Sequence, residues 1–313
     1  MYFSILSIRC SIVSIVISGL VHTCICLSDD ELISGLRAHL AAVGGPGLQH
    51  ASTEFLTHFL RTEANDVQAT VERIKMYARY RREHSDMFLT VGAAASDRKH
   101  QIFYFQPDVT PSGESIVYVK PSNWNVQRDN VSQAFSAFVP FIELAANLDP
   151  NKSNQGRLPP DATDLDHDHP NHQLYNRHFS SYVDPTNGYV VLLDMKDWTW
   201  RHAYNMASPA QLSMLFELIE KALPVRIRKI HVINQNFLYE IAFNVARQFM
   251  SQRFTNLFVT HGWTLVELER AVPMHVRPTV VGGLKDLHTY TTQDIIELDT
   301  KLAEIRSNIS VRK

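Results

Sequence analysis

The stretch Val225–Gly262, VRIRKIHVINQNFLYEIAFNVARQFMSQRFTNLFVTHG, decides the fold of this chain. Its run Lys229–Ile233 is short and β-branched, which is typical of a buried strand. Apolar residues then recur at every fourth position over Phe237–Phe249, which predicts an amphipathic helix. A second short apolar run, Leu257–Thr260, ends at a His-Gly pair. A strand, a crossover helix and a second strand of these lengths predict a parallel βαβ unit.

The apolar face of this helix, formed by Phe237, Ile241, Val245 and Phe249, has two interpretations. It can pack on the sheet as ordinary core, as most such faces do. It can also close over a cavity that holds an apolar ligand, because ligand pockets are lined mainly by hydrophobic side chains. The residues of the helix alone leave both interpretations open.

Periodicity elsewhere in the chain predicts a mixture of helices and strands, which indicates an α/β fold. Two strand–helix–strand units follow one another, so the sheet is expected to be mixed or mainly parallel. The predicted strands are 102–105, 115–119 and 189–193, and the predicted helices are 29–39, 67–82, 126–148, 209–222 and 293–307.

The order of strand, amphipathic helix, basic turn, short strand and His-Gly resembles the CRAL-TRIO lipid-binding family, to which the tocopherol transfer protein and cellular retinaldehyde-binding protein belong. A second match is Tyr189–Asn205, YVVLLDMKDWTWRHAYN, which is similar to the family's strand ending in Asp and the loop and helix after it. A third is Phe55–Phe88, which resembles the helical module before the lipid domain. Together the matches extend over most of Asp29–Asp286.

The resemblance implies a small N-terminal helical domain followed by a CRAL-TRIO domain, whose sheet is mixed and mainly parallel. It also implies that the helix Phe237–Phe249 is a gate over an apolar pocket. The expected divisions are a hydrophobic leader at 1–27, a helical domain at 28–95, a lipid-binding domain at 96–286 with a polar insertion at 149–188, and a C-terminal helix at 287–313.

The function that the resemblance implies is non-enzymatic binding and transfer of one small hydrophobic lipid, similar to tocopherol, a retinoid or a phosphoinositide, without a cofactor. The alternative is a scaffold that uses the fold for protein contacts without a lipid. Catalytic motifs are missing, since the sequence has no GxSxG, P-loop, GxGxxG after a strand or HExxH. The isolated histidines His202, His231 and His261 are expected to be structural.

The ligand pocket is expected between the sheet and the gate helix. A charged residue at Ile241 is then expected to expel the ligand. The side chains expected to line the pocket are Phe138, Tyr189, Val191, Leu193, Trp200, Tyr204, Val232, Phe237, Ile241, Val245 and Phe249.

In the resembled transfer proteins a basic patch beside the gate helix binds phosphoinositide headgroups, and basic residues stand at matching positions here. Two departures weaken the match, since Leu257 stands where a basic residue is found and Thr62-Glu63 replaces part of a basic turn. The alternative is a solvated basic turn. The residues expected to bind phosphatidylinositol bisphosphate at a membrane surface are Arg226, Arg228, Lys229, Arg247 and Arg253.

The length of 313 residues and the hydrophobic content of 45% allow one large or two small domains with a real core. A formal net charge of -2 argues against a nucleic-acid partner. The run Ile12–Val21 is almost wholly apolar, which is typical of a signal peptide and predicts secretion or membrane association. A cytoplasmic protein with an upstream extension is the alternative.

All three cysteines lie in the leader, so no disulfide, thiol nucleophile or cysteine-zinc site is expected in the rest of the chain. The polar insertion alternates His and Asp, for example at Asp166, His167 and His169, and a divalent metal could use both residue types as ligands. A polar surface loop explains the same residues with fewer assumptions. No metal site is therefore predicted.

Overall fold

The computed structural model describes residues 28–42, 50–96, 102–147, 187–206, 208–262 and 265–309. The predicted leader lies outside these ranges, and so does the polar insertion apart from its last two residues. Within the described ranges, every helix is too short or too polar to span a bilayer.

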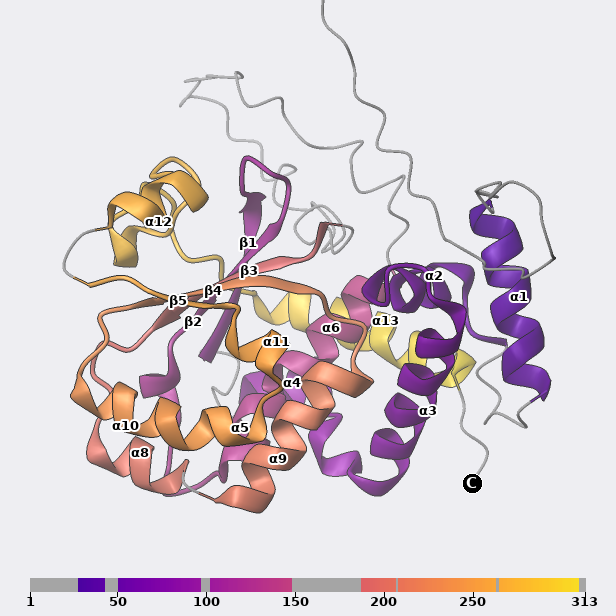
Figure 1. Cartoon of the computed structure of the whole chain (residues 1–313), viewed down its shortest axis with the longest axis horizontal. Coiled ribbons are helices and arrows are strands. Elements are labelled where there is room, and N and C mark those ends of the chain that lie inside the picture. The colour runs from indigo at the N-terminus through magenta and orange to yellow at the C-terminus, as the bar shows by residue number, and fades with distance from the viewer. Residues whose placement is uncertain are drawn as a thin grey trace, which may run out of the picture.

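A sheet of five strands forms the centre of the fold, and the strands lie side by side in chain order (Figure 1). The strands are β1 Phe103–Val109, β2 Ser115–Val119, β3 Tyr189–Asp194, β4 Ile227–Ile233 and β5 Phe258–Thr260. β1 and β2 pair antiparallel, and the remaining neighbours pair parallel. This confirms the mixed, mainly parallel sheet that the sequence predicts.

The described helices that connect the parallel strands cover one face of the sheet (Figure 1). This follows from strands in chain order joined by crossovers of one hand. The other face is covered by α12, Val266–Ala271, and the chain after it. The connecting helices are α5 Val131–Phe135, α6 Val139–Ala146, α8 Trp200–Asn205, α9 Pro209–Glu217, α10 Phe237–Ala246 and α11 Gln252–Thr255.

Residues along β3 alternate between the two faces of the sheet, as the pleat requires. Val190 and Leu192 pack in the cluster beneath α12, whereas Tyr189 packs in the main core with the connecting helices. The pairing of β3 with β4 shifts by one residue, because Tyr189 pairs with Ile227 while Val190 pairs with Lys229. The extra residue is a bulge in β4.

Three N-terminal helices pack beside the sheet domain: α1 Asp29–Ala42, α2 Thr53–Thr62 and α3 Val67–Glu83. The Ser52 hydroxyl caps α2 by accepting from the Phe55 amide at 3.1 Å, and the Asp66 carboxylate caps α3 by accepting from the Ala69 amide at 3.0 Å. Aromatic side chains of α2 and α3 share one core with residues of the sheet and its helices.

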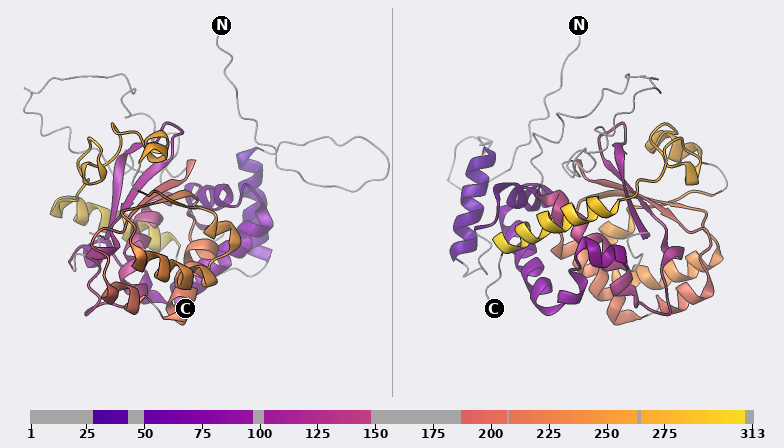
Figure 2. Two further views of the ribbon diagram at one scale, coloured as in Figure 1. Left: turned by 60° about the vertical axis from the view of Figure 1, so that its left-hand side comes forward. Right: turned by 180° about the vertical axis from the view of Figure 1, so that it is seen from behind.

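The C-terminal helix α13, Thr292–Asn308, lies along the back of the molecule between the N-terminal helices and the sheet (Figure 2). Its Asp299 carboxylate accepts from the amides of Val91, at 2.6 Å, and Gly92, at 2.8 Å. These amides begin the short helix α4, Val91–Ser96, which the sequence analysis missed because its small residues show no apolar period.

The predicted helix 126–148 is wrong as a single element. Residues 126–130 precede the first helix, and α5, a short 3₁₀ turn at Ser136–Phe138, and α6 follow. Pro140 lies in the first turn of α6, where a residue without an amide hydrogen is tolerated, whereas it would remove a hydrogen bond inside a continuous helix.

Candidate functional site

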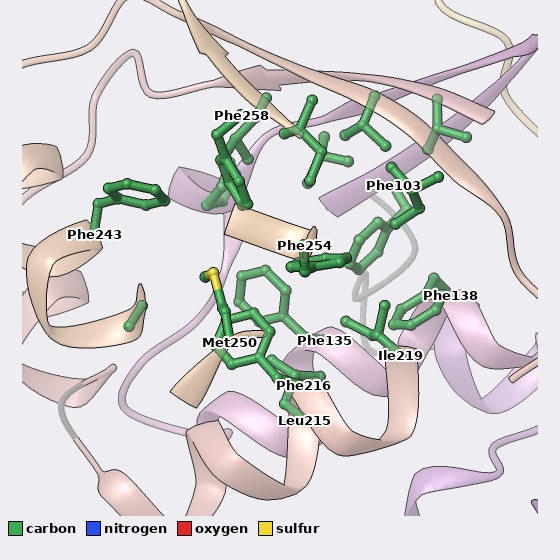
Figure 3. A pocket seen from close by; sticks show the side chains of 18 of the residues that line it. Phe103, Phe135, Phe138, Leu215, Phe216, Ile219, Phe243, Met250, Phe254 and Phe258 are labelled. Carbon is green, nitrogen blue, oxygen red and sulfur yellow. The ribbon is translucent and has the colours of Figure 1, made fainter. Parts of the chain in front are cut away.

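A cavity of about 200 Å³ lies between the helical face of the sheet and the helices packed on it (Figure 3). This is far more than the roughly 10–15 Å³ that one water needs. Strand alternation builds one wall, because Tyr189, Val191 and Leu193 of β3 all face the helices. Ile227 and Ile230 of β4 both face the cavity as well, which the bulge between them allows.

The opposite wall comes from the helices and is rich in aromatic side chains. Leu215, Phe216 and Ile219 project upward from the helix that begins at Pro209, and Phe254 and Met250 extend into the space between this helix and the sheet (Figure 3). The Phe216 and Phe254 ring centroids are 6.0 Å apart, so these two side chains form one part of the wall together.

Helix α10 closes one side of the cavity. Its cap, Asn236, accepts from the amides of Leu238 and Tyr239 and donates to the Trp198 carbonyl at 3.2 Å. This contact connects the start of α10 to the loop after β3. The residues of α10 that face the cavity recur at helical spacing and are Tyr239, Ala242, Phe243 and Ala246.

The gate-helix face predicted to line the pocket is therefore the wrong one. Phe237 is 61% exposed, Ile241 45% and Val245 36%, so these three point away from the cavity. A charged residue at Ile241 would meet solvent and not the ligand. Phe249 is half-buried and does not line the cavity, because α10 ends at Ala246 and a 3₁₀ turn follows.

Helix α8 likewise turns its predicted residues outward. Trp200 is 59% exposed and Tyr204 81% exposed. The buried residue of α8 is His202, which stacks on Trp198 with ring centroids 4.8 Å apart. Residues two positions before and after His202 lie on the opposite side of the helix. Trp200 and Tyr204, which were predicted to line the cavity, therefore lie outside it.

Most of the remaining predicted lining residues do line the cavity. Phe138, Tyr189, Val191 and Leu193 line the cavity, whereas Val232 is fully buried in the core beside it. That any of them contacts a ligand stays a prediction. The lining residues that the prediction omitted include Phe103, Phe105, Phe135, Phe216, Ile219, Tyr239, Ala242, Phe243, Met250, Phe254 and Phe258.

Burial shifts the pKa of two groups near the cavity toward their neutral forms. It raises the pKa of Tyr239 and lowers the pKa of His202. On the other sheet face, His231 donates to or accepts from His261 across 2.7 Å, and burial and this neighbour lower the pKa of His231 to about 4. That these histidines are structural stays a prediction.

A second, open recess of about 520 Å³ lies between the N-terminal helices and β4. Arg226 and Arg253, two of the predicted phosphoinositide ligands, line it together with Lys221. Glu72 and Glu220 also line it and reduce its positive charge.

The recess also holds Arg73, which is already neutralised. Its guanidinium donates to the Glu63 carboxylate and to the Leu223 carbonyl at 2.8 Å. Leu257 and Thr62-Glu63, where this sequence lacks basic residues of the resembled family, also line this recess.

The other three predicted basic ligands do not line the recess. Arg228 donates from Nε to the Asn187 carbonyl at 2.9 Å. Lys229 is exposed on β4, and Arg247 is exposed after the end of α10. The structure therefore brings together two of the five predicted basic residues.

Comparison with known proteins gives one family and a set of distant relatives. The family model described as the CRAL/TRIO domain matches residues 99–283. Clavesin-2 of Rattus norvegicus is 20% identical over 242 residues, which cover 76% of this chain and 64% of that protein. Alpha-tocopherol transfer protein-like of Homo sapiens is 20% identical over 231 residues, covering 73% and 58%. The chain thus spans less than two thirds of the length of these curated relatives.

Among solved structures, the crystal structure of Sfh5 has a similar fold, with a TM-score of 0.50 at 10% sequence identity. The match covers 88% of this chain and 97% of that chain. The family model takes in the whole sheet and every helix that walls the cavity. The chain therefore belongs to the CRAL/TRIO domain family.

Proposed function

We propose that this chain is a non-enzymatic carrier of one small hydrophobic lipid, which it holds in the cavity between the sheet and α10. The observation that supports this proposal is the apolar wall, since a pocket of this kind binds ligands by removing them from water. Each CH₂ group that leaves water contributes about 0.8 kcal/mol. A tocopherol-, retinoid- or phosphoinositide-like lipid can therefore be held through its apolar part without a charged partner.

Native mass spectrometry of the full chain from animal cells, followed by organic extraction, tests this function directly. We expect a bound mass that disappears on extraction and is recovered as a lipid in the organic phase. A chain without such a mass would favour the alternative function, a scaffold for protein contacts.

Replacing Ala242 by phenylalanine is expected to lower the lipid recovered per mole of protein at least about tenfold, because the ring would occupy the cavity and remove several buried CH₂ contacts. The matched control is Ile241→Phe, which adds the same ring to the outer side of the same helix. Recovered lipid is measured by mass spectrometry of the extract. Equal losses in both variants would contradict the cavity as the binding site.

We also propose that the carrier docks on phosphoinositide-containing membranes through two surfaces. The first is an outer apolar stripe, defined as Trp200, Tyr204, Phe237, Ile241 and Val245. Its two helices touch, and the Trp200 and Phe237 ring centroids are 5.9 Å apart. Exposed apolar groups of this kind mark protein or membrane contact sites.

The second surface is the recess that Arg226 and Arg253 line. Basic residues near an anionic surface contribute about 1 kcal/mol each. Changing both to alanine is expected to weaken binding to vesicles with phosphatidylinositol bisphosphate about thirtyfold at low salt, with a smaller effect as salt is added. Vesicle sedimentation measures the binding.

The control for this pair is the double change Lys229→Ala and Arg247→Ala, which removes the same charge from exposed positions outside the recess. Binding to neutral vesicles should be the same for all variants. If both double variants lose affinity equally, the recess has no special role and only general charge attraction remains.

A further inference from the structure

Two residues that line the cavity carry a buried polar atom without a hydrogen-bond partner. They are Trp198, in the loop after β3, and Tyr239, in the first turn of α10. Trp198 is 3% exposed and Tyr239 5% exposed, and neither the indole Nε1 nor the phenol hydroxyl has a partner in the described part of the chain. Buried polar atoms almost always have a partner, because an unpaired one loses its hydrogen bonds to water. Two unpaired atoms in one wall therefore indicate a partner from outside the chain.

Buried groups of the same kinds are paired elsewhere in the fold. The Trp124 indole donates to the Asp129 carbonyl at 3.0 Å, and the Tyr118 hydroxyl donates to the Asp194 carboxylate at 2.7 Å. Neither Trp124 nor Tyr118 lines the cavity. The interior of the fold thus supplies acceptors for these side chains, whereas the cavity wall supplies none for Trp198 and Tyr239.

Asn236 holds the two unpaired residues close together. Its side-chain amide donates to the Trp198 carbonyl at 3.2 Å, and its side-chain oxygen accepts from the Tyr239 amide at 3.2 Å. The Tyr239 ring stacks on Phe243 with centroids 5.6 Å apart, and the Trp198 ring stacks on His202. These contacts hold both rings in the wall and leave their polar atoms unpaired.

The absence of charge in the wall limits which ligand group can pair with them. None of the described residues that line the cavity is Asp, Glu, Lys, Arg or His, so an ionised group would be buried there without a counter-charge. An indole N–H donates, whereas a phenol hydroxyl both donates and accepts. Burial raises the pKa of Tyr239, so its hydroxyl stays protonated. The group that fits both atoms is a neutral oxygen, as in an alcohol, an aldehyde, a ketone or an ester.

We propose that Trp198 and Tyr239 form a polar anchor that takes one neutral oxygen of the bound lipid and so sets the orientation of the lipid in the cavity. This proposal rests on the proposed function and adds a specificity to it. The ligand class is then a hydrophobic lipid whose buried part carries a neutral oxygen. Such an oxygen exchanges its hydrogen bonds to water for hydrogen bonds to the anchor, and a ligand without it leaves both atoms unpaired.

The test uses two probes of equal chain length, 1-hexadecanol and hexadecane. Each is delivered from cyclodextrin to the delipidated full chain, and the retained probe is measured by gas chromatography of an organic extract. Tyr239→Phe removes one hydroxyl and little else, so we expect the ratio of retained hexadecanol to retained hexadecane to fall about tenfold. Trp198→Phe should lower the same ratio. The matched control is Tyr204→Phe, which removes a hydroxyl from an 81% exposed side chain outside the cavity and should leave the ratio unchanged.

Urea unfolding of the delipidated chain distinguishes a ligand anchor from a structural hydroxyl. Tyr239→Phe should leave the unfolding midpoint unchanged or raise it, since the variant loses a buried hydroxyl that has no partner in the fold. A hydroxyl that stabilises the fold through a partner would instead give a lower midpoint in the variant.

The outcomes separate the anchor from the function that it rests on. An unchanged probe ratio in Tyr239→Phe, or a lower unfolding midpoint in this variant, overturns the anchor and leaves a lipid carrier. Retention of neither probe, in a chain that also yields no lipid on extraction, overturns both the anchor and the proposed function.

Discussion

Replacing Arg306 by methionine is expected to destabilise the chain by about 3–5 kcal/mol, because the change leaves a buried carboxylate without its cation. Glu143 is fully buried, and its Oε2 accepts from Arg306 Nε at 3.2 Å. Arg306 also donates to the Leu89 carbonyl at 3.0 Å. Burial and the neighbouring carboxylate raise the pKa of Tyr77, so its hydroxyl stays protonated and donates to Glu143. Urea unfolding of the variant measures the loss.

The control is Lys301→Met on the same helix, where Lys301 Nζ lies 3.0 Å from Glu297 in an exposed pair. An exposed pair of this kind contributes about 0.5 kcal/mol or less. Adding Glu143→Leu to Arg306→Met should recover much of the loss, since no unpaired charge then stays buried. If Arg306→Met costs no more than Lys301→Met, the network does not stabilise the fold.

This network connects segments that the sequence analysis assigns to different domains. Tyr77 belongs to the predicted segment 28–95, Glu143 to 96–286 and Arg306 to 287–313. We therefore propose that the described parts of these segments unfold as one unit. The domain boundaries themselves stay a prediction.

The sheet could be predicted from the sequence because its signals are local. Short apolar runs such as Ser115–Val119 and Tyr189–Asp194 are buried or half-buried on both faces, and segments with a helical period separate them. Strand alternation then places Val191 and Leu193 in the cavity wall once one face is known. Together with Tyr189 on the same strand and Phe138, they are the predicted lining residues that line the cavity.

The inner face of α10 could not be predicted in the same way. Its sequence FLYEIAFNVA is apolar on two sides, and only Glu240 and Asn244 interrupt it. Periodicity therefore fits a face through Ile241 and a face through Ala242 equally well. The choice depends on tertiary contacts between residues far apart in the chain, such as the one from Asn236 to the Trp198 carbonyl and the one between the Phe243 and Phe258 rings.

The basic recess shows the same limit. Arg226 and Arg253 were expected beside the gate helix from their place in the sequence. In the same recess Glu63, in the turn before α3, forms an ion pair with Arg73 on α3. This pair depends on how the chain folds. The sequence shows how many charged residues a segment carries. Which of them are neutralised by an ion pair depends on the packing of the folded chain.

Changing Phe237 and Ile241 together to aspartate is expected to weaken binding to phosphoinositide vesicles roughly a hundredfold, or about 3 kcal/mol. Both side chains are exposed in the outer apolar stripe, so a membrane would bury apolar surface that the free protein leaves in water. Two carboxylates at these positions would remove that gain and repel anionic headgroups. Vesicle flotation measures the binding, and lipid retention in solution should stay unchanged because neither residue lines the cavity.

The matched control is Ile296→Asp on α13, since Ile296 is 56% exposed and lies on a different element from the stripe. This change introduces the same kind of charge at a similarly exposed apolar position and should leave vesicle binding within about twofold, as surface substitutions usually stay within 0.5 kcal/mol. An equal loss in Ile296→Asp would show that negative charge alone weakens binding. Unchanged binding in the double variant would remove the outer apolar stripe from the docking surface, and the recess with Arg226 and Arg253 would then have to hold the membrane by itself.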